Sequence, residues 1–218
     1  MSILDSLSLS PSLRESLARA TAEFEKNVDD LASFLEPRGI ARADATSARL
    51  GRASEWPGFE RFAGMMAIPY CRPNGGVVAI KFRCIKPHDC KAEGCQRYDA
   101  PAGQAARLYG ADHLLRGGEV AAVVEGELKA RVVTDNLGVP AVGTSAGVWL
   151  DHWPRTLADF DRVLVIADND EAGLKHAKGK VLKTIPNAEL IVPPAEYPKI
   201  DDWVVAAGAA TVRKALNV

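Results

Sequence analysis

Two short apolar runs that end in acidic residues constrain the fold of this chain most strongly. Residues 120–125 read Val-Ala-Ala-Val-Val-Glu, and residues 162–170 read Arg-Val-Leu-Val-Ile-Ala-Asp-Asn-Asp. Such runs are typical of parallel strands that are buried on both faces. In an open α/β sheet, ligands bind outside the carboxyl ends of the strands. Glu125, Asp168 and Asp170 are therefore expected at one edge of a sheet, where they predict a divalent-metal site.

The chemistry of this acidic group favours Mg²⁺ or Mn²⁺. Hard cations prefer carboxylate oxygens, and three neighbouring carboxylates would repel one another unless a cation lay between them. Asp168 and Asp170 are spaced i, i+2, so both can face one ion, and Gly126 permits a sharp turn after Glu125. Metal ions held there would activate a 3′-hydroxyl and stabilise a leaving pyrophosphate. The alternative interpretation is that these acids are solvated helix caps.

The second half of the chain predicts a parallel sheet with crossover helices, because strand-like and helix-like segments alternate there. Strands are expected at 119–125, 139–143, 162–168 and 188–193, with helices at 127–137, 147–158, 171–184 and 201–216. The first half predicts a long helix over 12–36 and a hairpin of two strands, 65–70 and 77–84, joined through an Asn-Gly turn. We place the domain boundary at Gly117-Gly118, giving an N-terminal domain, 1–117, and a C-terminal domain, 118–218.

Charge and hydropathy narrow the classes of function. Residues 61–116 contain nine Lys/Arg and four Asp/Glu, a balance of +5, whereas the rest of the chain contains 18 and 24, a balance of −6. A basic segment beside an acidic one is what an enzyme acting on nucleic acid through a metal ion would need. The chain lacks an apolar run of membrane-spanning length, and its first residues lack a basic n-region. We therefore expect a cytoplasmic location, no membrane partner and reduced cysteines.

The acidic motifs resemble those of the Toprim domain, which occurs in bacterial-type (DnaG-like) DNA primases, topoisomerases and related nucleases. Toprim domains have Glu-Gly after the first strand and Asp-x-Asp after the third, and these match Glu125-Gly126 and Asp168-Asn169-Asp170. The segment 139–144 resembles the second strand of that family. The resemblance implies a Rossmann-like α/β sheet preceded by a mixed α+β subdomain of the primase core.

Upstream segments are similar to the primase core and extend the resemblance over residues 34–216. They are Phe34–Ile40, Ile68–Tyr70, Gly75–Arg83, Gln96–Pro101 and Leu108–Gly110, and the likeness is greatest to phage-encoded primases. Three departures stand out. Many primases have an acid where this chain has Lys129, so Glu127 is the alternative ligand. The usual N-terminal zinc ribbon is missing. The third acidic motif is matched loosely by Asp201-Asp202. Either Asp202 or Asp201 joins the metal ligands, or Asp201 caps the last helix.

The resemblance implies a replication enzyme that synthesises short RNA primers on single-stranded DNA. Its partners would be a DNA template, ribonucleoside triphosphates and either a replicative helicase or a separate zinc-bearing subunit. Glu125, Asp168 and Asp170 would be catalytic and would hold Mg²⁺. A Toprim-type nuclease uses the same acids with water as the nucleophile, and a non-catalytic module would bind DNA alone; both alternatives stay open.

Two further groups of side chains are candidates for binding. The candidates for binding nucleic acid or nucleotide are Arg72, Lys81, Arg83, Arg97 and Tyr98. The basic side chains would contact phosphate, and the tyrosine ring could stack on a base. The second group, Cys84, His88, Cys90 and Cys95, has the spacing C-x3-H-x-C-x4-C and suits a tetrahedral Zn²⁺. The alternative interpretations are solvated charges and a loop with scattered reduced cysteines.

Overall fold

The structure, a computed structural model, describes residues 9–145 and 147–218. Residues 1–8, on which the interpretation of the N-terminus rests, lie outside the described part. Two compact units make up the chain. The first contains the residues up to Glu36 and Ala41–Arg107, and the second contains Pro37–Ile40 and Leu108–Val218. The functional boundary at residue 117 stays a prediction.

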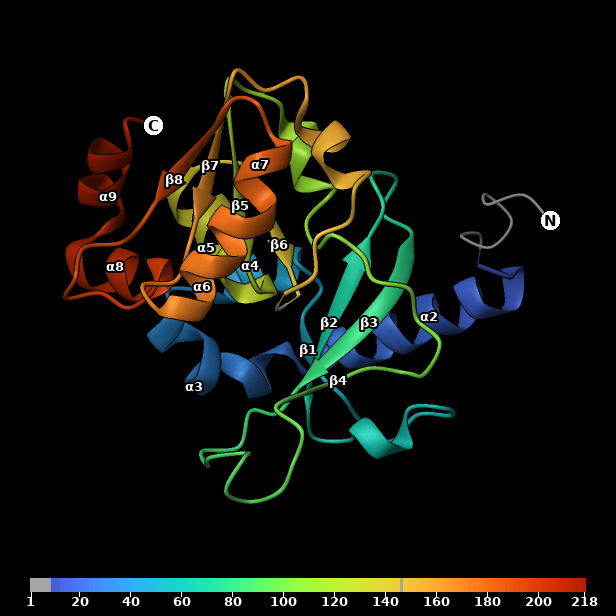
Figure 1. The fold of residues 1–218 in the computed structure, drawn as a ribbon. Coiled ribbons are helices and arrows are strands. Elements are labelled where there is room, and N and C mark those ends of the chain that lie inside the picture. Colours follow the sequence, from blue (N-terminus) through green and yellow to red (C-terminus); the bar gives the residue numbers. More distant parts are fainter. Residues whose placement is uncertain (1–8, 146) are drawn as a thin grey trace. The chain divides into compact units, whose positions relative to one another are not determined.

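The first unit is built on a four-stranded antiparallel sheet in the order β1-β2-β3-β4 (Figure 1). The strands are β1 (Gly51–Arg52), β2 (Met66–Cys71), β3 (Val77–Arg83) and β4 (Tyr98–Asp99). The predicted hairpin is present: Arg72 N donates to Gly76 O at 2.9 Å, and Gly75 adopts φ +78°, which glycine allows at no steric cost. The short strand β4 pairs with the end of β3, so the chain between Arg83 and Tyr98 forms a closed loop.

Helices of the first unit are shorter than the spacing of apolar residues predicts. They are α2 (Pro11–Phe24), a 3-10 helix (Glu25–Leu31), α3 (Ala32–Leu35), a 3-10 turn (Glu36–Arg38), α4 (Arg42–Ser47) and a 3-10 turn (Glu60–Phe62). The single helix predicted over 12–36 is interrupted at Asn27, whose backbone is not helical. Phe24 nevertheless packs edge-on against Phe59 and Phe82 in the core beneath the sheet.

The second unit contains the predicted parallel sheet, in the order β6-β5-β7-β8. Its strands are β5 (Val120–Glu125), β6 (Ala141–Thr144), β7 (Arg162–Ile166) and β8 (Ala188–Ile191). Both apolar runs form neighbouring central strands, since β5 pairs with β7 from Val120↔Arg162 to Val124↔Ile166. The mixed α/β class with a parallel sheet is thus confirmed, and the acids that follow the two runs lie at one edge.

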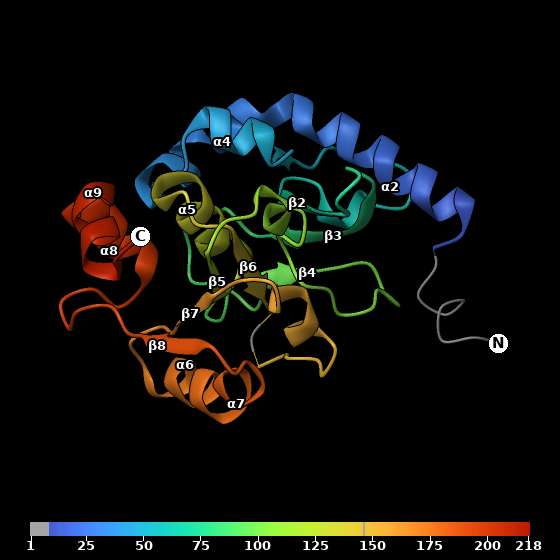
Figure 2. The same ribbon diagram turned by 90° about the horizontal axis from the view of Figure 1, so that it is seen from above.

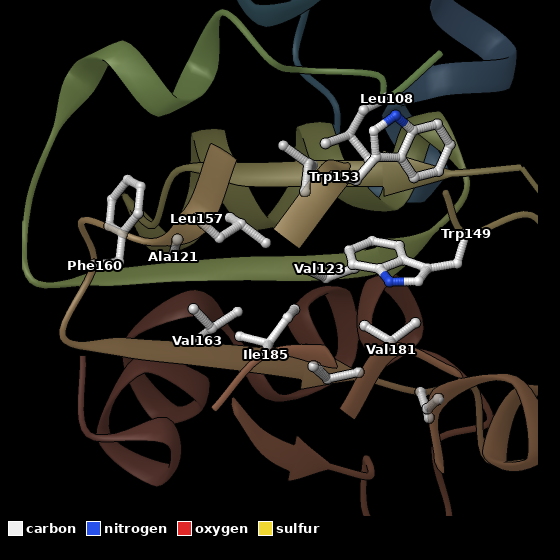
Figure 3. Close-up of a cluster of buried hydrophobic side chains, with 14 residues drawn as sticks. Leu108, Ala121, Val123, Trp149, Trp153, Leu157, Phe160, Val163, Val181 and Ile185 are labelled. Carbon is white, nitrogen blue, oxygen red and sulfur yellow. The ribbon is translucent and has the colours of Figure 1, made fainter. Parts of the chain in front are cut away.

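Helices cover both faces of the parallel sheet (Figure 2). They are α5 (Glu127–Leu137), 3-10 segments at His113–Arg116 and Trp153–Leu157, α6 (Glu171–His176), a π-helical segment (Ala177–Val181), α7 (Leu182–Thr184), α8 (Ile200–Ala207) and α9 (Ala209–Leu216). Helix α5 lies on one face, and α6 and α7 lie on the other. Between the sheet and α6 and α7 lies a hydrophobic cluster, in which Val123 and Val163 of the strands pack with Trp149 and Val181 (Figure 3). This packing fixes the strand ends that present the acids.

Two predicted helices of the second unit differ from the observed ones. Residues 147–158 contain only the 3-10 helix Trp153–Leu157, and the last predicted helix is divided into α8 and α9 by Gly208, at φ +82°. A left-handed residue cannot continue a right-handed helix, so the break follows from local geometry. No described helix is both long and apolar enough to cross a membrane.

Candidate active site

Glu125 and Asp168 share a narrow pocket at the carboxyl edge of the parallel sheet. Glu125 ends β5 opposite Thr144 of β6, and Asp168 follows β7 after Ala167. Both acids line a cavity of ≈ 10 Å³, together with Thr144, Gly173 and apolar side chains of the strands. That volume accommodates about one water-sized sphere. The pocket therefore brings together two of the three predicted catalytic acids, each from its own strand end.

The turn from β5 into α5 depends on glycines. Gly126 has φ +93° and ψ 156°, a conformation that other L-residues rarely adopt, and it directly precedes the first helical residue, Glu127. Gly143 of β6 lies against this turn, and a Cβ atom there would meet Gly126 O at 2.6 Å. The Glu-Gly motif therefore sets the path of the backbone as well as supplying a carboxylate.

Lys129 forms an ion pair with the carboxylate of Asp168. Its Nζ donates to Oδ2 of Asp168 at 2.6 Å and also contacts Oδ1, and each side chain is only 13 % exposed. Lys129 lies one turn into α5, four residues after Glu125. At this departure from the primase pattern, the ammonium group supplies a positive charge beside the pocket. The contact could not be predicted from the sequence, because 39 residues separate Lys129 from Asp168.

Asp170 caps helix α6 instead of facing the pocket. Its Oδ1 accepts a hydrogen bond from Gly173 N at 2.7 Å, as an N-cap aspartate does. Gly173 in turn packs against Asp168, where a Cβ atom would lie 2.8 Å from Asp168 O. The Asp-x-Asp motif and the following glycine thus hold the loop in one shape. A metal-binding role for Asp170 stays a prediction, because a carboxylate retains a second oxygen.

His176 lines the same pocket and was not singled out by the sequence. Its Nε2 is buried and has no hydrogen-bond partner among the described residues. Burial lowers the pKa of His176, while the charge of Glu125 opposes that shift. Its position six residues after Asp170 gives no recognisable ligand spacing, so only the orientation of α6 reveals it. The pocket consequently contains an imidazole whose neutral form is favoured by burial.

The remaining acids lie in different environments. Glu127 is buried within the first turn of α5. Asp202, the predicted additional ligand, is exposed in the first turn of α8, whereas Asp201 has a buried Oδ1 that lacks a hydrogen-bond partner within the described chain. The alternative that Asp201 caps this helix is not observed, because the N-cap residue is Lys199. Which of the two aspartates joins the metal ligands stays a prediction.

The acidic pocket fits a hard divalent cation by its donor chemistry. Carboxylate oxygens of Glu125 and Asp168, supplied by adjacent strand ends, are the ligands that Mg²⁺ prefers. Lys129 currently neutralises Asp168, so a cation would compete with its ammonium group. Among the described residues, only the Cys/His group brings three or more metal-ligating atoms within 4.8 Å of one another. Glu125 and Asp168 therefore lie at the carboxyl edge of the parallel sheet, but they do not form a group of three or more ligand atoms around one point.

The basic candidates of the first unit form two groups. Arg83 lies between the rings of Phe34 and Tyr98, at 5.2 and 4.9 Å, and its Nη1 donates to the Tyr98 hydroxyl. Lys81 contacts the same tyrosine ring, with Nζ 4.6 Å from the centroid. Both basic side chains of β3 therefore contact the ring of Tyr98 on β4. Cation–π contacts of this kind contribute roughly 0.5–2 kcal/mol each.

Arg72 and Arg97 form the second group of basic candidates. Arg97 is exposed, and Arg72 is half-buried close enough to Arg107 for its charge to lower the pKa of that guanidinium, an effect second to burial. Within the described chain, neither Arg72 nor Arg107 has an acidic partner within 4 Å. Unpaired guanidinium groups are suited to phosphate. The basic candidates therefore divide into Arg83 and Lys81, which contact aromatic rings, and half-buried Arg72 and exposed Arg97.

Comparison with solved structures defines the class of fold. The chain matches the RNA polymerase domain of Mycobacterium tuberculosis primase DnaG with a TM-score of 0.76, at 20% identity, over 94% of this chain and 82% of that one. It matches a DNA primase domain from Pseudomonas aeruginosa with a TM-score of 0.75, at 17% identity, over 92% and 77%. A DnaG primase catalytic domain bound to single-stranded DNA gives 0.73, at 14% identity, over 94% and 78%. The fold is that of the DnaG primase catalytic core.

A sequence relative then defines the family. The gene 57 protein of Mycobacterium phage D29 is 33% identical over 152 residues, which are 67% of this chain and 94% of the phage protein. The chain belongs to the same family as this phage protein. No protein-family model matches the chain.

Proposed function

We propose that this chain is a DNA primase that synthesises short RNA primers on single-stranded DNA. The observation that carries the proposal is the pocket containing Glu125 and Asp168, at the carboxyl edge of the parallel sheet in a fold of the DnaG type. The Toprim interpretation of the second unit belongs to this proposal. The chain would use ribonucleoside triphosphates and a DNA template and would act with a replicative helicase or a zinc-bearing subunit.

In the proposed mechanism, Glu125 and Asp168 would hold the cation, and Asp170 and either Asp201 or Asp202 would complete its set of ligands. Bound Mg²⁺ or Mn²⁺ would neutralise phosphate charge and lower the pKa of the attacking 3′-hydroxyl. In this proposal Glu125 would also accept the hydroxyl proton. Gly173 holds the backbone of Asp168 in position, and the apolar lining of the pocket limits access of water.

One observation favours the alternative of a non-catalytic DNA-binding module. The ammonium group of Lys129 already forms an ion pair with Asp168, which would otherwise be available to a metal ion. A Toprim-type nuclease is a further alternative that uses the same acids. Incubation with single-stranded DNA, labelled ribonucleotides and Mg²⁺ distinguishes the three. RNA products support the primase, DNA fragments support the nuclease, and binding without chemistry supports the module.

Template binding is expected to depend on Arg72 and Arg97. Phosphate contacts release counterions, so loss of each contact should reduce the magnitude of the slope of log K against log salt by about 0.7 on single strands. The double variant Arg72→Ala/Arg97→Ala is therefore expected to flatten the slope and to weaken binding to different sequences equally. Fluorescence anisotropy over a salt series measures both quantities.

Arg14→Ala is the matched control, because Arg14 is exposed on α2 of the same unit and has no acidic partner within 4 Å among the described residues. It should leave the slope unchanged. The Arg83 side chain is left intact in this test, since its removal would also lose packing against Phe34 and Tyr98. An unaltered slope in the double variant would place the DNA on another surface.

A further inference from the structure

The loop between β3 and β4 gathers four metal-ligating side chains around one point. One ligand atom from each of Cys84, His88, Cys90 and Cys95 lies within 4.8 Å of all the others. The imidazole is central to the contacts: His88 Nε2 is 3.5 Å from Cys84 Sγ, 3.5 Å from Cys90 Sγ and 3.1 Å from Cys95 Sγ. The spacing of the sequence is therefore accompanied by convergence in space.

Hydrogen bonding does not account for this arrangement. A ring nitrogen either donates one proton or accepts through one lone pair, so His88 Nε2 satisfies one sulfur atom at most. Tetrahedral Zn²⁺, with Zn–S near 2.3 Å and Zn–N near 2.0–2.1 Å, requires sulfur–nitrogen separations of about 3.5 Å. Two of the three observed separations equal that value, and Cys95 must move outward by a few tenths of an ångström. Coordination to a common centre explains all three contacts together.

Backbone hydrogen bonds of the loop hold the cysteines of the cluster close together. Cys95 N donates to Cys90 O at 2.8 Å, at the end of a turn that Gly94 closes with φ +64°. Lys91 N donates to Asp89 Oδ1 at 2.9 Å at the start of the same turn. Cys84 N donates to Arg97 O at 2.9 Å and joins the two ends of the loop.

Burial of apolar side chains contributes little to the stability of the loop. Between Ile85 and Arg97, Cys90 is the only buried residue. A segment of this length without apolar burial does not offset its loss of conformational entropy unless a covalent or metal crosslink constrains it. None of the four cysteines of the chain forms a disulfide in the described structure.

We propose that Cys84, His88, Cys90 and Cys95 bind one structural Zn²⁺ that closes the β3–β4 loop. The site has four protein ligands and no open position, as structural zinc sites do. Cys84 directly follows Arg83, and two residues separate Cys95 from β4, so the ion would connect the ends of both strands where Arg83 contacts Tyr98. Zinc binding would thereby hold the neighbouring basic side chains in place.

The test is the metal content of the full chain after purification in chelator-free buffer. We expect about one zinc per chain, as one four-ligand site requires. Cys90→Ser and His88→Ala should each lose most of this zinc, whereas Cys71→Ser should retain it, because Cys71 lies on β2 outside the cluster. Replacement by Co²⁺ should give the intense visible absorption of tetrahedral thiolate coordination in the wild type and in Cys71→Ser only.

Thiol titration of the unaltered protein makes the test independent of variants that fail to fold. With zinc bound, the three cluster cysteines should be protected from a thiol reagent, and a chelator should expose them. Zinc-free protein with three reactive cluster thiols and no tetrahedral cobalt spectrum would overturn the proposal, as would a disulfide within the cluster. Because these measurements need no DNA or nucleotides, they stand or fall separately from the primase assignment.

Discussion

Asp168→Asn is expected to reduce Mg²⁺-dependent primer synthesis by at least about a hundredfold, since the transition state would lose a metal ligand and a preorganised charge. The amide keeps the shape of the side chain and one acceptor for Lys129, so the backbone next to Gly173 should be retained. The more disruptive Asp168→Ala should abolish synthesis as well. Rates of nucleotide incorporation measure the effect.

The matched control for this prediction is Asp159→Asn, an exposed aspartate of the same unit. Its activity should equal that of the wild type. Circular dichroism and thermal unfolding should show that Asp168→Asn remains folded. Wild-type primer yield from folded Asp168→Asn would remove the acid from the mechanism and, with it, the proposed metal site.

Lys129→Met is expected to lower the Mg²⁺ concentration that gives half-maximal synthesis by about tenfold. The ammonium group competes with the cation for Asp168 and repels it, and interactions between charges a few ångströms apart amount to several kcal/mol at a protein surface. Methionine has similar length and bulk without the charge. Titration of activity with Mg²⁺ gives the half-maximal concentration directly.

The same variant should also change the coupling between metal and stability. Removing Lys129 leaves a carboxylate that is only 13 % exposed without its cationic partner, which should cost roughly 1–3 kcal/mol in the metal-free protein. Added Mg²⁺ should therefore raise the Tm of Lys129→Met more than that of the wild type. Lys178→Met, at an exposed position after α6, should show neither effect. Identical Mg²⁺ requirements in wild type and Lys129→Met would mean that the ammonium does not compete for the site.

The sequence predicted those features that local pattern determines. Buried apolar runs identified β5 and β7 as neighbouring strands, and their acidic ends gave the edge at which Glu125 and Asp168 meet. The Cys/His spacing likewise anticipated the convergence in the β3–β4 loop. In each case the residues are close in sequence or follow strands whose pairing is dictated by burial.

Features that depend on the orientation of helices could not be predicted. The contact between Lys129 and Asp168 and the entry of His176 into the pocket require the packing of α5 and α6 on opposite faces of the sheet. The capping role of Asp170 agrees with the alternative interpretation of these acids as helix caps. The break between α8 and α9 at Gly208 could not be predicted from the spacing of apolar residues. It depends on the positive φ angle of Gly208, which is visible only in the structure.

Template-directed synthesis of RNA is the measurement that tests the primase assignment most directly. The full chain, unlabelled single-stranded DNA of defined sequence, Mg²⁺ and labelled ribonucleoside triphosphates are incubated, and the products are separated by length. We expect short products that are destroyed by alkali, resist DNase, require the template and have the complementary sequence, and that disappear with Asp168→Asn. Folded protein that binds the DNA yet yields no such product with any template or divalent cation, or that cuts the template instead, would contradict the primase assignment.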